Sequence, residues 1–142
     1  MSKGSKIALI ALACTLVIGT IIVIISLNST DDIQDYILGE DVIKSVATIV
    51  GKRDVTDTSI STQNNGTTRT VTYQSSTVHD DLIAYTQYLR TDGGFVVLGD
   101  GDFVELGKPS VEQGHIIIMT INYDYHEYTI TIQKGVGEFY FE

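Results

Sequence analysis

An unbroken run of apolar and small residues, from Ile7 to Leu27, constrains this chain more than any other feature. The run contains no charged residue and no proline. About 20 residues of this kind, folded as a helix, span the roughly 30 Å hydrocarbon core of a bilayer. The sequence therefore predicts one transmembrane helix at 7–27, which makes the lipid bilayer the first partner of the chain.

The residues flanking this run predict its orientation. Lys3 and Lys6 precede it, whereas the acidic residues between positions 31 and 41 follow it with Lys44 as the only nearby base. Basic flanks stay on the cytoplasmic side of a membrane. We therefore expect residues 1–6 to be cytoplasmic and residues 28–142 to be extracytoplasmic.

Two alternatives keep the membrane targeting but change the N-terminus. A cleaved signal peptide would use the same basic flank, but its apolar region spans only about 7–15 residues, and the run here is longer. Lipidation at Cys14 is the second alternative, because Leu12-Ala13-Cys14 resembles the end of a bacterial lipobox. Ala11 stands where that motif usually has leucine, and the residues after Cys14 stay apolar. The length favours an uncleaved anchor, and recovery of the intact chain in the soluble fraction after carbonate extraction would contradict it.

The composition limits what the exterior part can be. All 18 Asp and Glu residues follow the apolar run, together with seven of the nine Lys and Arg residues. Such an acidic chain is a poor match for nucleic acid or anionic lipid by bulk electrostatics, although the acidity also serves solubility alone. Cys14 is the only cysteine, so no internal disulfide forms, and the exterior domain must be held by its core.

Two segments between the anchor and position 75 have different periodicities. Over residues 28–53, apolar residues recur at helical spacing but Gly39 interrupts them, which predicts either a broken amphipathic helix through Val50 or a stalk followed by a short helix. Residues 54–75 alternate around Asn64-Asn65-Gly66, a turn sequence, and predict a partly exposed or edge hairpin.

Residues 77–90 predict the clearest helix of the exterior part. Val78, Leu82, Tyr85 and Leu89 fall on one stripe, Arg90 lies in the last turn, and two glycines follow. We expect this helix to pack one face onto a sheet.

The remaining sequence predicts short strands. We expect strands at 95–98, 103–106, 115–123 and 126–133, a turn at 124–125, loops at 107–114 and 134–137, and an apolar tail at 139–141. The fold class predicted is α+β: one transmembrane helix, then a small antiparallel-sheet domain at 54–142, of about four to six strands, with one packed amphipathic helix.

The carboxylates near one predicted turn are the only metal candidates. Asp100, Asp102 and Glu105 offer the oxygen ligands that calcium prefers, but the EF-hand spacing is missing, and turn chemistry alone explains Asp and Gly here. The spacing of the three histidines gives no sign of a zinc site. We therefore expect no bound metal and no cofactor.

Tyrosines are the best interaction candidates. Tyr123, Tyr125 and Tyr128 cluster near the last predicted turn. Tyrosine is common at protein interfaces because it combines a large apolar ring with a polar group, although it also packs in cores. Nucleophile elbows and phosphate-binding loops are absent from the sequence, which argues against an enzyme.

Two resemblances add expectations. Over residues 67–134, the sequences Tyr85 to Leu89, Gly93-Gly94-Phe95, Ile116 to Ile121 and Tyr128 to Ile132 resemble a recurring type of small, uncharacterised membrane-anchored protein of Gram-positive bacteria, which implies no known activity. Met1-Ser2-Lys3-Gly4 followed by an apolar helix and C-terminal strands is similar to type IV pilin-like proteins, but Leu9 stands where they usually carry glutamate.

The function expected from the sequence is therefore non-catalytic. We expect a membrane-anchored extracytoplasmic interaction or assembly module with a protein partner. The alternatives are a pilin-like structural subunit and a ligand- or metal-sensing exterior domain.

Overall fold

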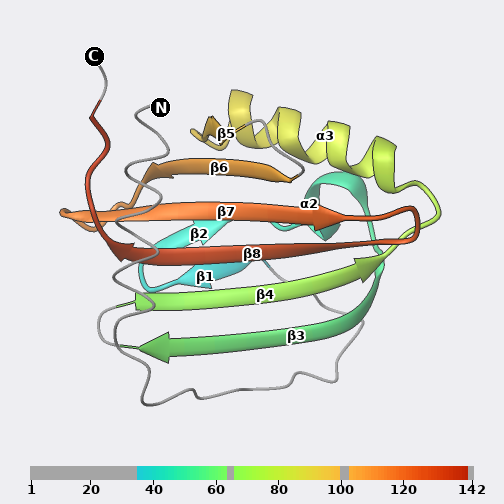
Figure 1. The fold of residues 1–142 in the computed structure, drawn as a ribbon, viewed down its shortest axis with the longest axis horizontal. Helices are drawn as coiled ribbons and strands as arrows, with labels where there is room; N and C mark the ends of the chain where they lie inside the picture. The colour runs from blue at the N-terminus through green and yellow to red at the C-terminus, as the bar shows by residue number, and fades with distance from the viewer. Residues whose placement is uncertain (1–34, 64–65, 100–102, 141–142) are drawn as a thin grey trace.

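A computed structural model describes residues 35–63, 66–99 and 103–140 (Figure 1). The predicted anchor at 7–27 lies outside these residues. Within the described part, no helix is long and apolar enough to cross a membrane.

A six-stranded antiparallel sheet forms the centre of the domain, which confirms the predicted sheet. Its strands lie in the order β3 (Asp54–Gln63), β4 (Gly66–Gln74), β8 (Glu127–Val136), β7 (His115–Tyr123), β6 (Val104–Pro109) and β5 (Val96–Gly99). After β4 the chain leaves the sheet and returns at the opposite edge with β5. The strands β6, β7 and β8 then follow one another inwards across the sheet, and β8 pairs with β4 (Figure 1).

The predicted hairpins are present, but two strands run further than the sequence indicated. β3 pairs with β4 as predicted at 54–75, and β7 spans the predicted residues. Residues 107–109 continue β6, and residues 134–136 continue β8, where loops were predicted. Both extensions pair with β7, for example Lys108 with Ile117 and Gly135 with Ile116, so ladder hydrogen bonding overrides the loop tendency of Gly and Pro.

The predicted helix at 77–90 is confirmed as α3 (Val78–Thr91). All four stripe residues are buried against the sheet, in one core with β4, β6, β7 and β8. Thr77 occupies the N-cap position but makes no side-chain cap, because its hydroxyl donates to the Asp81 carboxylate instead.

The prediction of a broken helix is wrong over residues 36–43. These residues form a hairpin of β1 (Tyr36–Leu38) and β2 (Asp41–Ile43), and only α2 (Val46–Val50) is helical. Gly39, at φ 64°, permits the tight turn between the two strands. The hairpin and α2 pack into the same core as α3, so the folded unit begins upstream of the predicted boundary at 54.

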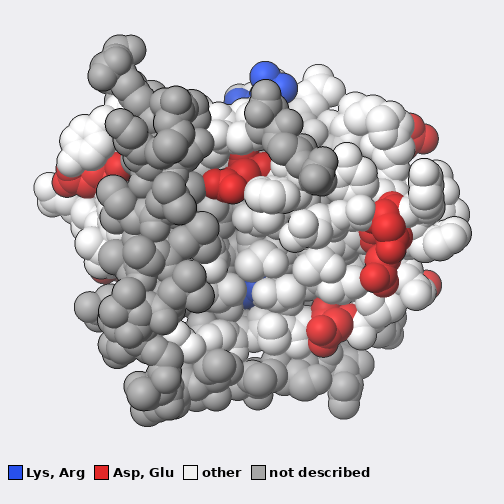
Figure 2. Space-filling model, viewed as in Figure 1, with Lys and Arg blue, Asp and Glu red and all other residues white. Residues whose placement is uncertain are grey.

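The two faces of the sheet differ in chemistry. In Figure 1, β1, β2 and α2 lie behind the sheet, on the same side as the core with α3. On the opposite face, polar residues alternate with the core residues, and the Thr72 and Thr129 hydroxyls lie 2.9 Å apart. Figure 2 shows this face, on which the described Asp and Glu residues form separate groups and few Lys or Arg atoms are visible.

The C-terminal segment covers one end of this polar face. A Cβ at Gly107 would lie 2.7 Å from the Phe139 ring and 2.8 Å from Leu98, and one at Gly137 would lie 2.8 Å from Ile116. Phe139 thus packs on a second, smaller cluster of Leu98, Ile116 and Ile118. Glycine at position 107 is what lets the ring approach the sheet.

Candidate functional site

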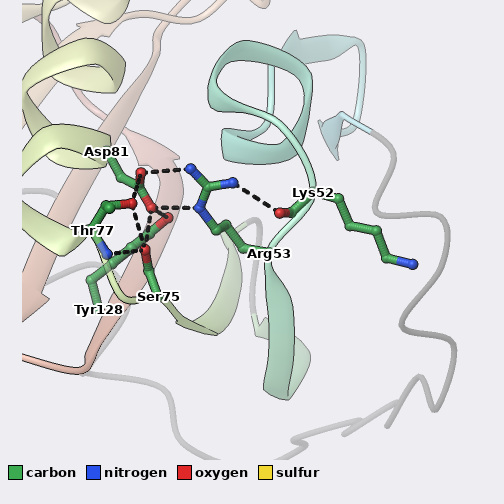
Figure 3. Close-up of polar contacts among 6 residues, drawn as sticks. All are labelled: Lys52, Arg53, Ser75, Thr77, Asp81 and Tyr128. Carbon is green, nitrogen blue, oxygen red and sulfur yellow. Dashed lines mark hydrogen bonds and ion pairs between the residues drawn. The ribbon is translucent and has the colours of Figure 1, made fainter.

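A buried carboxylate fixes the end of the domain where α3 begins (Figure 3). Asp81 in α3 is 3 % exposed, and Arg53, just before β3, donates to it twice, from Nε and Nη2 at 2.7 Å each. Ser75 Oγ donates at 2.7 Å, Thr77 Oγ1 at 3.0 Å and Tyr128 OH at 3.1 Å. Arg53 directly precedes β3, Ser75 follows β4, Thr77 precedes α3 and Tyr128 lies in β8. The Asp81 carboxylate therefore links four elements of the fold.

The electrostatics of this group are those of a structural ion pair. Burial alone would raise the pKa of Asp81, but the hydrogen bonds led by Arg53 lower that pKa to about 2. The same pairing raises the pKa of Arg53. Burial, and then the Asp81 charge, raise the pKa of Tyr128, so this phenol stays protonated as a donor. Both oxygens of the Asp81 carboxylate therefore accept hydrogen bonds from side chains of the protein. We conclude that Asp81 holds these side chains in place.

A second buried ion pair ties the β1–β2 hairpin to the sheet. Lys134 in β8 lies 2.9 Å from Asp41 in β2 and donates to the Leu38 carbonyl at 3.2 Å. Asp41 also accepts from Ser110 Oγ at 2.6 Å and from the Val111 amide at 2.9 Å. Burial opposes both charges, but the hydrogen bonds dominate, so the pKa of Asp41 is lowered and that of Lys134 is raised. This pair too is structural.

Four tyrosines are buried in the core of the domain. Tyr36, Tyr73, Tyr85 and Tyr128 are fully buried. The Tyr36 and Tyr73 hydroxyls bond to each other, Tyr85 donates to the Lys44 carbonyl at 2.8 Å, and the Tyr73 and Tyr128 rings lie 5.5 Å apart. Because the phenol groups have internal partners, this cluster belongs to the core.

An open groove of about 820 Å³ lies between the first half of α3 and the end of the β7–β8 hairpin. Figure 1 shows the start of α3 and the β7–β8 connection at the same end of the sheet. The apolar lining consists of Val78, Leu82, Ile83, Val104, Tyr123 and Tyr125. The polar lining consists of Ser76, Thr77, His79, Asp80, Thr86 and Asp124. We call this site the hairpin groove.

The hairpin groove combines exposed apolar surface with negative charge. Ile83 is 51 %, Tyr123 55 % and Tyr125 92 % exposed. Asp124 accepts from the His126 and Glu127 amides at 2.7 and 2.9 Å, and these backbone hydrogen bonds lower its pKa. Among the described lining residues there is no Lys or Arg. The groove therefore offers aromatic contact area beside an anion.

Asp81 and the side chains that donate to it, the Asp81 network, contact residues in both walls of this groove. Thr77 lines the groove and donates to Asp81, and Tyr128, which also donates to Asp81, is the cross-strand partner of Tyr123. Cross-strand partners share a face of the sheet. One buried charge thus holds both walls, the start of α3 and the hairpin.

No family model, curated protein or solved structure matches this chain.

The structure separates the three tyrosines predicted as interaction residues. Tyr123 and Tyr125 line the hairpin groove, whereas Tyr128 is fully buried. Of the metal candidates, Asp100 and Asp102 lie outside the described residues, and Glu105 is a half-buried residue of β6 whose pKa is raised by burial. Within the described residues, no three His, Cys, Asp or Glu side chains are placed to hold a metal ion.

Sequence reasoning missed Ile83 and the Arg53–Asp81 pair. Ile83 lies in the predicted helix at 77–90 but outside its apolar stripe, and in the structure it lines the hairpin groove and is half exposed. The pair joins residues separated by 28 positions. The signal available was an acidic residue, Asp81, that directly precedes Leu82 on the apolar side of α3.

Proposed function

We propose that this chain is a non-catalytic interaction module at the outer face of a bacterial membrane, anchored by residues 7–27, and that its hairpin groove binds a partner protein. The observation that carries the proposal is the exposure of Ile83, Tyr123 and Tyr125 around one groove. Exposed apolar groups gathered in one place are typical of interaction sites, and tyrosine is enriched among the residues that dominate binding energy.

The supporting framework is rigid, as a preformed site requires. The groove walls rest on the Asp81 network and on strands paired along their whole length. A preformed site loses less conformational entropy when the partner docks.

Photo-crosslinking in native membranes tests the proposal. A photoreactive residue at Tyr125 should crosslink one partner protein that mass spectrometry identifies, and Ile83→Glu should abolish that product. Ala84→Glu is the matched control, because Ala84 is exposed on the same helix but does not line the groove. A product of the same yield in both variants, or a product that contains only two copies of this chain, would overturn the proposal.

The anchor is tested separately by intact mass and N-terminal sequencing of the protein from native membranes. A full-length start, with or without Met1, supports the uncleaved anchor. A start at Ser5 would instead favour the pilin-like structural subunit. A lipid-bearing start at Cys14 would make the protein a lipoprotein and would contradict a helix spanning the membrane at 7–27.

A further inference from the structure

Each wall of the hairpin groove carries one carboxylate without a Lys or Arg partner among the described residues. Asp80 lies in the first turn of α3, and Asp124 lies in the connection between β7 and β8. The described ion pairs of the fold involve neither of them. Arg53, which reaches the start of α3, donates to Asp81 and to the Lys52 carbonyl instead. The two carboxylates are therefore available to a cation of the partner.

The turn between β7 and β8 fixes the orientation of the Asp124 carboxylate. Its Oδ1 accepts from both the His126 and the Glu127 amides, whereas its Oδ2 makes no hydrogen bond to a described residue. A carboxylate that is already held in one orientation loses little further freedom when a cation binds to its second oxygen. Asp124 is thus a preorganised anionic contact.

The surroundings of this carboxylate also suit a cation. Tyr123 and Tyr125 flank it in the sequence, line the same groove and are both exposed. The face of a tyrosine ring attracts ammonium and guanidinium groups, and arginine also stacks on it. Ile83 and Val104 add apolar lining. An acidic segment would meet repulsion here, and a wholly apolar segment would cover charged groups without pairing them.

From this charge distribution we propose that the hairpin groove binds a segment of the partner protein in which one basic residue lies between apolar residues. The basic side chain pairs with Asp80 and Asp124, and its apolar neighbours contact Ile83 and Val104. This inference rests on the proposed function and specifies the chemistry of the partner. The charges contribute selectivity and the rate of association, while the aromatic and apolar contacts contribute most of the affinity.

The crosslink from a photoreactive residue at Tyr125, formed by the full chain in native membranes, provides the assay. At about pH 8 histidine carries little charge, which excludes a contribution from His79 and His126, the two histidines near the carboxylates. Removal of both negative charges, by Asp80→Asn together with Asp124→Asn, should lower the yield of the crosslinked product about fivefold at low salt.

Two features make this comparison specific to charge. Asp124→Asn keeps a side-chain oxygen that accepts from the two amides of the turn, so the connection between β7 and β8 is preserved. Asp57→Asn is the matched control, because Asp57 is exposed in β3 and does not line the groove. The same loss of charge at that position should leave the yield unchanged.

Salt separates the charges from the apolar contacts without any substitution. Raising the NaCl concentration from about 0.05 to about 0.5 M shortens the range of charge interactions, so the wild-type yield should fall towards that of the double variant. Once mass spectrometry has located the crosslinked segment, replacement of its basic residue by glutamate should abolish the product, and Asp124→Lys should restore it.

The outcomes distinguish this inference from the proposed function. A yield that neither salt nor the double variant changes, but that Ile83→Glu abolishes, would overturn the basic segment while the proposed function stands. A crosslinked segment without a basic residue would have the same meaning. If the wild-type protein forms no crosslink to a partner, both are overturned.

Discussion

Replacing Asp81 with asparagine should destabilise the domain most at neutral pH and least in strong acid. The Asp81 carboxyl has a folded-state pKa of about 2 against 3.8 for its ordinary value. Each unit of pKa difference corresponds to about 1.4 kcal/mol, so the ionised form contributes about 2 kcal/mol to stability. Because the folded pKa is the lower one, this contribution is complete above about pH 4 and is lost as the pH falls from 4 towards 2.

The amide also leaves Arg53 without its counter-ion. Breaking a buried ion pair from one side costs about 3–5 kcal/mol. The Arg53 side chain is 24 % exposed and retains contact with water, so we expect the lower end, about 3 kcal/mol at pH 7. At pH 2 the wild-type carboxyl loses most of its advantage, and the difference between the two proteins should narrow to about 1 kcal/mol.

Urea unfolding of the full chain at pH 7, 5, 3 and 2, followed by near-ultraviolet circular dichroism of the buried tyrosines, measures this difference. Asp80→Asn is the matched control, because Asp80 is exposed in the same first turn of α3 and its loss removes only a favourable interaction with the helix dipole, worth about 0.5 kcal/mol. A difference between wild type and Asp81→Asn that stays constant from pH 7 to pH 2 would refute the reasoning.

Three further predictions concern the other contacts of the fold. Gly107→Ala should destabilise the protein, because the new methyl group would meet the Phe139 ring. Adding Phe139→Ala to this variant should lower the stability only a little further. Thermal unfolding of both single variants and of the double variant measures this coupling. Lys134→Met should cost about 3 kcal/mol by leaving its buried carboxylate unpaired, and hydrogen exchange should show the largest loss of protection in β1 and β2. Tyr36→Phe and Tyr73→Phe should each cost about 1 kcal/mol, and the double variant less than their sum, in urea unfolding at pH 7.

Long, regular patterns in the sequence were sufficient to predict much of the sheet and its helix. In α3, the stripe of Val78, Leu82, Tyr85 and Leu89 repeats over three turns, so the helical periodicity predicts which apolar residues of α3 are buried in the core. β7 follows the same logic, with consecutive isoleucines that are buried on both faces of the sheet.

Short segments could not be predicted, because their periodicity is ambiguous. The hairpin of β1 and β2 offers three residues per strand, and apolar residues at such short range fit a helix as well as a strand. The extension of β8 through Lys134 was also hidden, because a lysine followed by glycine indicates a loop. Only the pairing with Asp41 and Glu112, both distant from Lys134 in the sequence, accounts for a buried charge at that position.

The site was partly accessible from the sequence for a similar reason. Tyr123 and Tyr128 are cross-strand partners on one face of the sheet. The alternation of apolar and polar residues along the two strands therefore assigns both tyrosines to the same face and cannot tell which of them is buried. What distinguishes them is the start of α3, where Asp81 binds the Tyr128 hydroxyl while Tyr123 stays half exposed. That distinction depends on tertiary packing, which the local pattern of the strand does not contain.

The strand order also limits when the sheet can be completed during synthesis of the chain. Among the described strands, β4 finds its inner neighbour in β8, the last of them along the sequence, and the same strand supplies Lys134 to the hairpin of β1 and β2. During synthesis the N-terminal elements must therefore wait, with the inner edge of β4 unpaired, until the final strand has been made. Such long-range pairing slows folding and prolongs the exposure of an aggregation-prone edge. Because β8 joins β4 to β7, the two halves of the sheet can pair with each other only after β8 has been synthesised.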